Sequence, residues 1–178
     1  MAKSNRLANQ RKCRGSFIAE LPLVLWIFFM VLAFPLLNLS TAFLRVTFLY
    51  CGIHMASWSA ARANTYLTAV DGKPSATDET NTKIGQVKNA FSGIDMQNIK
   101  TEILETNITT LTTKSYTAPL AKAANQSENS YQIQVTADCI AQPFFPMPSP
   151  MPIAGVSAPL KFTLCARQYC ENPQGLNL

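Results

Sequence analysis

The chain has 178 residues, which is enough for one ordinary domain beside a membrane segment. Its formal net charge of +5 is unevenly placed, because five of the fifteen basic residues precede Gly15 and all ten acidic residues follow it. A nucleic-acid-binding domain keeps its basic excess on the folded part, so this distribution excludes nucleic acid as an expected partner. Basic flanks of membrane spans stay in the cytoplasm, and we therefore expect the residues after the span to be exported.

The element that organises the chain is an apolar run near its N-terminus. From Leu21 to Leu44 there is no charged residue, and about 20 apolar residues in a helix cross the hydrocarbon core of a bilayer. The sequence therefore predicts a basic leader over 1–15 and a transmembrane helix over 16–45. Pro35 falls in the middle of the span and should kink or loosen the helix. The basic residues nearest the span, which set its orientation, are Arg11, Lys12 and Arg14.

One carboxylate, Glu20, lies at the front edge of the run. A charge near the membrane interface costs a free energy of order 1–3 kcal/mol, so this carboxylate needs a partner. A secretory signal peptide has an apolar core of about 7–15 residues, and the run here is longer. A plain signal anchor fits the length, with Glu20 reaching back to the interface. A prepilin-type leader also fits, because cleavage after Gly15 leaves Ser16 as the first mature residue and Glu20 as the fifth. Glu20 can then neutralise the new ammonium of a neighbouring subunit within the membrane.

This N-terminus resembles that of TadE-like proteins, the minor pseudopilins of tight-adherence (Flp-type) pilus systems. Their Gly-x4-Glu motif leads into a Leu-rich span with an early proline, and the helix emerges in an Ala-Arg-rich stretch. Here Ala19-Glu20-Leu21-Pro22 opens the span and Ala60-Ala61-Arg62-Ala63 closes the helix. Classical type IV pilins usually start with an aromatic residue or Met, and Ser16 departs from that. The resemblance implies cleavage after Gly15 by a prepilin peptidase and a role for Glu20 in subunit assembly.

Beyond the span, the helix is expected to continue outside the membrane over 46–70, because apolar and small residues recur at three- and four-residue spacing. The remaining residues, 71–178, are expected to form a small α+β domain. Within it, 75–93 favours a short amphipathic helix with a capped start, and the Thr- and Ile-rich stretch 99–111 favours one or two strands. The polar stretch 114–130 is interpreted as a loop.

The clearest strand is Tyr131–Ile140, in which apolar and polar residues alternate, and Ala158–Arg167 alternates in the same way. We expect them to form an antiparallel hairpin. The Pro-rich loop 142–152 between them contains five prolines, which disfavour a sheet ladder and favour an extended chain. One interpretation is a ligand for an aromatic groove of a partner. The other is a rigid connection whose apolar side chains cap the domain or touch the membrane surface. This half of the chain also resembles TadE-like proteins.

Four cysteines follow the span, namely Cys51, Cys139, Cys165 and Cys170, and they are consistent with export, because disulfides form in oxidising compartments. Four cysteines allow two disulfides in three connectivities, and the sequence alone does not choose among them. We expect at least one bridge among Cys139, Cys165 and Cys170, since the hairpin could place Cys139 near Cys165 and a local loop could join Cys165 to Cys170. Buried free thiols are the alternative. The first cysteine after the span, Cys51, lies three residues before His54, but no second histidine and no Cys-x2-Cys pair supports a metal site. No cofactor is expected.

The sequence carries no nucleophile elbow, phosphate loop or His-Glu-x2-His motif, so an enzyme is not expected. The predicted fold is α+β and type IV pilin-like, with a long N-terminal transmembrane helix that continues into a small antiparallel sheet domain. The resemblance implies a single-pass protein of the bacterial inner membrane with a cytoplasmic N-terminus and a periplasmic domain, which assembles or initiates a pilus and can enter a surface pilus. The implied partners are prepilin peptidase, other pilin subunits, the inner-membrane pilus platform and membrane lipid, with no small-molecule substrate. The alternatives are an uncleaved anchor presenting a periplasmic binding or adaptor domain, and a type II secretion pseudopilin.

Overall fold

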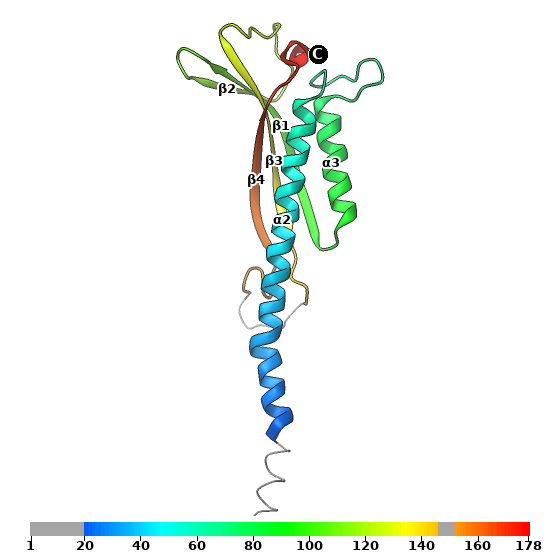
Figure 1. Cartoon of the computed structure of the whole chain (residues 1–178), viewed down its shortest axis with the longest axis vertical. Coiled ribbons are helices and arrows are strands. Elements are labelled where there is room, and N and C mark those ends of the chain that lie inside the picture. The colour runs from blue at the N-terminus through cyan, green and yellow to red at the C-terminus, as the bar shows by residue number, and fades with distance from the viewer. Residues whose placement is uncertain (1–19, 146–151) are drawn as a thin grey trace, which may run out of the picture.

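The structure, a computed structural model, describes residues 20–145 and 152–178. The predicted leader 1–15, the cleavage residues Gly15 and Ser16, and the middle of the Pro-rich loop lie outside the described residues. The expected α+β architecture is confirmed: one long apolar N-terminal helix is followed by a small four-stranded antiparallel sheet (Figure 1).

The long helix runs from Glu20 to Ala61, which is 42 residues, and its regular geometry is interrupted once. A π-helical segment, η1 (Phe29–Ala33), precedes the regular helix α2 (Phe34–Ala61). The N–H of Phe34 donates to the carbonyl of Phe29, five residues back, immediately before Pro35. Proline has no N–H, and its ring collides with the carbonyl four residues before it, so the preceding turn widens. The prediction that Pro35 loosens the helix is confirmed.

The outer part of α2 and a second helix, α3 (Ala76–Ala90), lie side by side on one face of the sheet (Figure 1). The strands are β1 (Ile94–Asn107), β2 (Thr113–Tyr116), β3 (Asn129–Ala141) and β4 (Leu160–Tyr169), in the spatial order β2-β1-β3-β4. Every pairing is antiparallel, so the predicted β3–β4 hairpin is confirmed. Alternate residues of β3 are buried beneath the helices, as period-two patterning requires.

Helix α2 packs closely because its inner face carries small residues. Ala56 and Ala60 are fully buried on this face. A Cβ added at Gly52 would come within 3.0 Å of side-chain atoms of Met96 and Val87, so glycine permits the close approach of α2 to α3 and β1. Tight packing of this kind fixes the orientation of the long helix against the domain.

The long helix ends at Ala61, so the predicted helical continuation to residue 70 is wrong. The chain turns after Arg62 because its backbone pairs with the C-terminal segment. The N–H of Tyr66 donates to the carbonyls of Gly175 and Leu178, and the N–H of Glu171 donates to the carbonyl of Ala61 at 2.8 Å.

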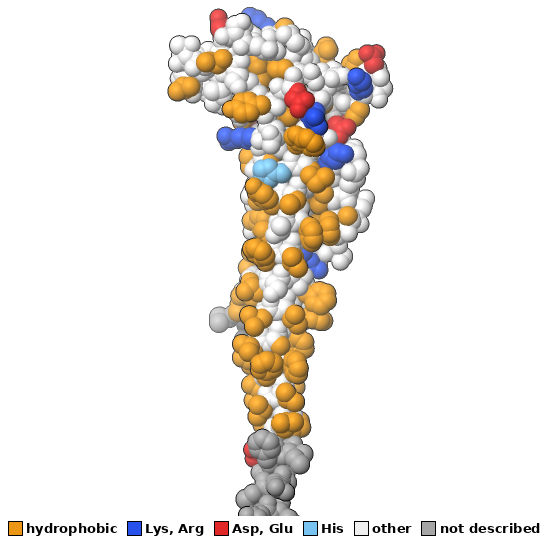
Figure 2. Space-filling model, in the orientation of Figure 1, with side chains coloured by type: hydrophobic (Ala, Val, Ile, Leu, Met, Phe, Trp, Pro, Cys, Tyr) orange, Lys and Arg blue, Asp and Glu red, His pale blue; other side chains and the backbone are white. Residues whose placement is uncertain are grey.

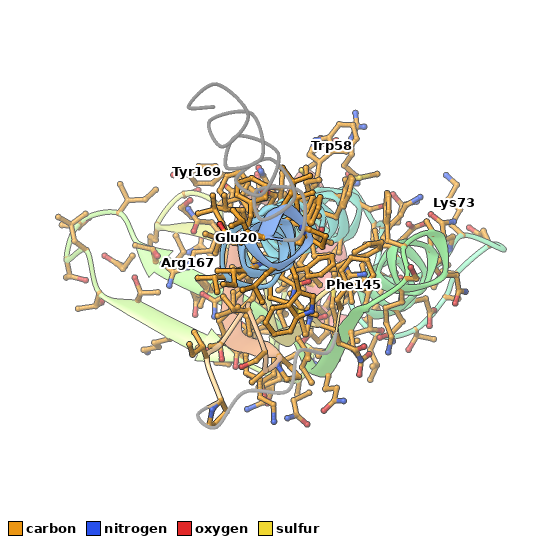
Figure 3. The ribbon with its side chains drawn as sticks, turned by 90° about the horizontal axis from the view of Figure 1, so that it is seen from below. Glu20, Trp58, Lys73, Phe145, Arg167 and Tyr169 are labelled. Carbon is orange, nitrogen blue, oxygen red and sulfur yellow. The ribbon has the colours of Figure 1, made fainter. Side chains whose placement is uncertain are left out.

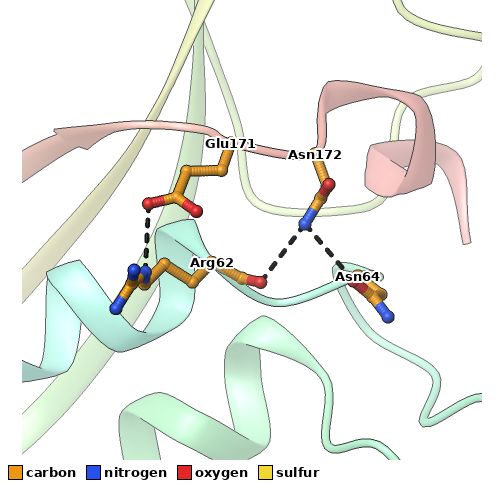
Figure 4. Close-up of polar contacts among 4 residues, drawn as sticks. All are labelled: Arg62, Asn64, Glu171 and Asn172. Carbon is orange, nitrogen blue, oxygen red and sulfur yellow. Dashed lines mark hydrogen bonds and ion pairs between the residues drawn. The ribbon is translucent and has the colours of Figure 1, made fainter.

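The last residues form a short 3₁₀ helix, η2 (Pro173–Asn177), that lies against the end of α2. Arg62 makes an ion pair with Glu171 at 3.0 Å, and Asn172 donates to the Arg62 carbonyl and to the side chain of Asn64 (Figure 4). The tail therefore closes the top of the domain over the helix end.

Two further sequence expectations need correction. Strand β1 begins at Ile94 rather than at residue 99. Its first residues were missed because the register shifts between Gln97 and Lys100, with Asn98 at φ +50°, and this bulge breaks the alternation that marks a strand. Strand β2 falls partly in the stretch interpreted as a loop. The predicted short helix is confirmed as α3; its capping box joins Ser75 and Asp78.

Candidate functional site

The lower part of the long helix stands free of the sheet domain: every residue from Leu21 to Leu32 is exposed, and apolar side chains cover the face seen in Figure 2. Val31 is 70% exposed and Phe43 is 72% exposed. Soluble monomers rarely expose a contiguous apolar surface of this extent, so lipid or other apolar helices must cover it. The helix is long and apolar enough to cross a membrane.

Two formally charged side chains delimit this surface. Glu20 is the first described residue, is exposed, and lies at the near end of the helix in the view from below (Figure 3). The next charged residue is Arg45, which the helical rise places about 38 Å further along the axis. The hydrocarbon core is about 30 Å thick, so the two charges are spaced to bracket it. The proposed cleavage residues, Gly15 and Ser16, are outside the described residues.

Asn38 is a fully buried amide within the apolar run, and the sequence analysis missed it. Its Nδ2 donates to the carbonyls of Phe145 at 2.9 Å and Val156 at 2.8 Å, and its Oδ1 accepts from the N–H of Phe145 at 2.8 Å. Both flanks of the Pro-rich loop are therefore attached to the helix at one residue. A lone amide in a charge-free run was the available signal, because such a group is costly in an apolar environment unless it is hydrogen-bonded.

Arg45, about two helical turns closer to the domain than Asn38, contacts the start of the same Pro-rich loop. Its Nη1 donates to the carbonyl of Gln142, and the N–H of Gln142 donates to the carbonyl of Gly93 at 2.9 Å. Gly93 has φ +77°, and an added Cβ would lie 2.5 Å from the guanidinium of Arg45. The positive φ favours glycine at this turn, and an added Cβ would also displace the guanidinium of Arg45.

The expected disulfides are absent among the described residues, where Cys51, Cys139, Cys165 and Cys170 are all free thiols. Cys139 is opposite Phe162 in the hairpin and faces the core, whereas Cys165 is opposite Thr136 and is exposed on the other face. Cys165 and Cys170 are five residues apart along an extended chain, which separates them by about 16 Å. Sulfur atoms placed this way cannot bond without rearrangement of the sheet.

Thiol labelling tests this arrangement. Burial raises the pKa of the Cys139 thiol to about 11, so at pH 8 it is both inaccessible and protonated. We expect a brief maleimide pulse on the folded, detergent-solubilised protein to modify the exposed Cys51 and Cys165, and to modify Cys139 only after unfolding. Peptide mass mapping reads out each site. Labelling of Cys139 as fast as Cys165, or an intact mass lower by two hydrogens, would contradict the structure.

A polar hollow of about 220 Å³ lies at the end of the β1–β2 hairpin, away from the long helix. Its carboxylate, Glu105, accepts hydrogen bonds from Tyr116 at 2.8 Å, Asn129 at 2.8 Å and Tyr131 at 2.9 Å. These donors give the carboxylate a structural role in joining β1, β2 and β3. No cluster of three or more metal-ligating His, Cys, Asp or Glu side chains occurs within the described ranges.

No protein family, curated protein or solved structure matches this chain. What the protein does is therefore inferred from its own residues and their geometry.

Proposed function

We propose that this protein is a minor pseudopilin of a tight-adherence pilus machine, in which it assembles or initiates the filament after removal of a leader by a prepilin peptidase. One combination of features carries the proposal. A basic leader is followed by Gly15 and Glu20 in Gly-x4-Glu spacing, and then by an apolar helix whose lower part extends beyond the sheet domain and is exposed. Each part has a role in such a protein, since the leader orients the chain, the glycine is the cleavage point, and the helix is the assembly surface.

The membrane arrangement follows from the charges. The N-terminus lies on the cytoplasmic side of the bacterial inner membrane, and the sheet domain lies in the periplasm. Glu20 sits at the cytoplasmic end of the span, where it pairs with the ammonium that cleavage creates on Ser16 of a neighbouring subunit. The partners are prepilin peptidase, other pilin subunits and the inner-membrane platform of the machine.

The uncleaved anchor remains the second candidate, because the exposed apolar helix supports it equally well. It differs in two respects: the chain would keep residues 1–15, and Glu20 would have no partner subunit. A type II secretion pseudopilin shares the processing step but would assemble with a different set of subunits.

A Gly15→Leu variant separates the two candidates. In cells that carry a complete tight-adherence system, we expect the wild type to co-purify from membranes with pilin and platform subunits. The variant should remain uncleaved and be lost from these complexes, because no new N-terminus is available to pair with Glu20 of a neighbour. A variant that co-purifies as efficiently as the wild type would contradict the proposal. Gly85→Ala, in α3 where an added Cβ meets no atom within 4 Å, is the matched control.

A further inference from the structure

The connection between β3 and β4 lies beside the membrane span instead of on the domain. The described parts of this connection, 142–145 and 152–159, flank the long helix below the sheet, and Phe145 lies at the side of the helix in the view from below (Figure 1 and Figure 3). Phe145 packs on Phe34 with ring centroids 5.6 Å apart, and Gly155 approaches Ala42. With the three hydrogen bonds of Asn38, these contacts place the connection on the apolar side of Arg45.

The depth of this attachment can be estimated from the helix itself. Asn38 lies about 25 Å along the axis from Leu21, where the charge-free run begins, and about 10 Å before Arg45. The hydrocarbon core is about 30 Å thick. With Leu21 at its inner edge, Asn38 lies within the outer leaflet, close to the interface.

The charges of the domain end where the connection begins. Asp95 on β1 and Lys161 on β4 are both opposite Ile140, and Asp95 pairs with Lys88 at 2.7 Å. Between Asp138 and Lys161 the chain has no charged residue. Phe144 is 55% exposed and Ile153 is 53% exposed, and both continue the apolar surface of the helix. The lower border of the domain is therefore charged, whereas neither the helix from Leu21 to Leu44 nor the connection carries a charged side chain.

In the described flanks of the connection, several backbone polar groups are hydrogen-bonded within the protein, which lowers the cost of placing an irregular segment next to lipid. Five of its residues over 142–152 are prolines, which have no N–H to satisfy. The N–H of Ile153 donates to Ser157 Oγ at 2.9 Å, and the carbonyl of Ile153 accepts from the N–H groups of Val156, Ser157 and Ala158. Asn38 accounts for both backbone groups of Phe145 and the carbonyl of Val156.

We propose that the two described flanks of the β3–β4 connection, 142–145 and 152–159, form a second membrane-contacting element, which inserts Phe144 and Ile153 among the lipid acyl chains of the outer leaflet beside the span. Its occupant is lipid. This contact fixes the height and rotation of the domain over the membrane, and it does not depend on the pilus function.

The test uses the full-length protein in lipid vesicles, with Trp26 and Trp58 replaced by Phe so that one introduced tryptophan reports alone. Phe144→Trp is the probe, Ile153→Trp is a second probe, and Ile108→Trp, on the exposed turn at the far end of the domain, is the matched control. We expect lipids brominated on their acyl chains to remove most of the emission of both probes, and to leave that of the control unchanged. Aqueous acrylamide should do the reverse.

Probes that acrylamide quenches as strongly as the control would overturn the proposal, because the connection would then face water. Probes protected from both quenchers would also overturn it, because a protein partner would then cover the connection. Either failure would leave cleavage after Gly15 intact, so it is distinct from a failure of the proposed function.

Discussion

Replacing Glu20 with Ala should leave removal of the leader unchanged and abolish most of the incorporation of the protein into pilus complexes. The cleavage point is Gly15, five residues before Glu20, the first residue of the described helix, so the substitution leaves the cleaved bond itself unchanged. The partner ammonium, however, would be left without its counter-ion at the membrane. Loss of one member of a buried ion pair costs about 3–5 kcal/mol, which is at least a hundredfold in association.

The measurement is the fraction of the chain that co-purifies with pilin and platform subunits, with intact mass as the check on cleavage. Glu128→Ala is the matched control, because it also removes one exposed carboxylate but lies in the sheet domain, away from the long helix. We expect its incorporation to stay close to that of the wild type. Unchanged incorporation of Glu20→Ala would show that the carboxylate only reaches the interface, as in a plain anchor.

Replacing Gly175 with Ala should be the most damaging single-methyl change in the domain. An added Cβ would lie 1.7 Å from the backbone carbonyl oxygen of Asn64, which cannot move without displacing the turn after α2. The 3₁₀ helix would leave its site and expose Leu176, which is buried, and the bond from the Leu120 N–H to the Leu176 carbonyl would be lost. We expect the free energy of unfolding to fall by about 2–4 kcal/mol.

Denaturant unfolding of the detergent-solubilised protein, followed by near-ultraviolet circular dichroism, measures this loss. Gly85→Ala provides the control, because Gly85 lies inside α3 with no atom within 4 Å of an added Cβ. Alanine is favoured over glycine in a helix interior by about 0.5–1 kcal/mol, so this variant should be slightly more stable than the wild type. Equal stability of the two variants would contradict the close packing of η2 against the turn after α2.

The elements with strong periodic patterns were predictable from the sequence. The alternation over Tyr131–Ile140 locates β3, and the charge-free run locates the helix, because burial on one side or contact with lipid imposes a regular pattern. The missed elements are those in which a local irregularity replaces the pattern. The bulge at Asn98 conceals the start of β1, and β2 is a short strand with exposed side chains.

The candidate site was predicted only in part, for a related reason. Glu20 could be predicted because a carboxylate at the edge of an apolar run is costly in free energy and therefore stands out in the sequence. Asn38 and Gly175 act through backbone groups far away in the sequence, at Phe145 and Asn64, and no spacing rule connects such residues. The disulfide expectation was wrong because the number of residues between cysteines does not reveal which face of the sheet each occupies. Cys139 faces the core and Cys165 faces outward.

The most direct test of the central claim is the intact mass of the wild-type chain extracted from membranes with and without a matched prepilin peptidase. We predict that the peptidase converts the 178-residue chain to a form that begins at Ser16, and that the chain keeps Met1 to Gly15 in its absence. Retention of the leader in the presence of a peptidase that processes its own pilin would contradict the account.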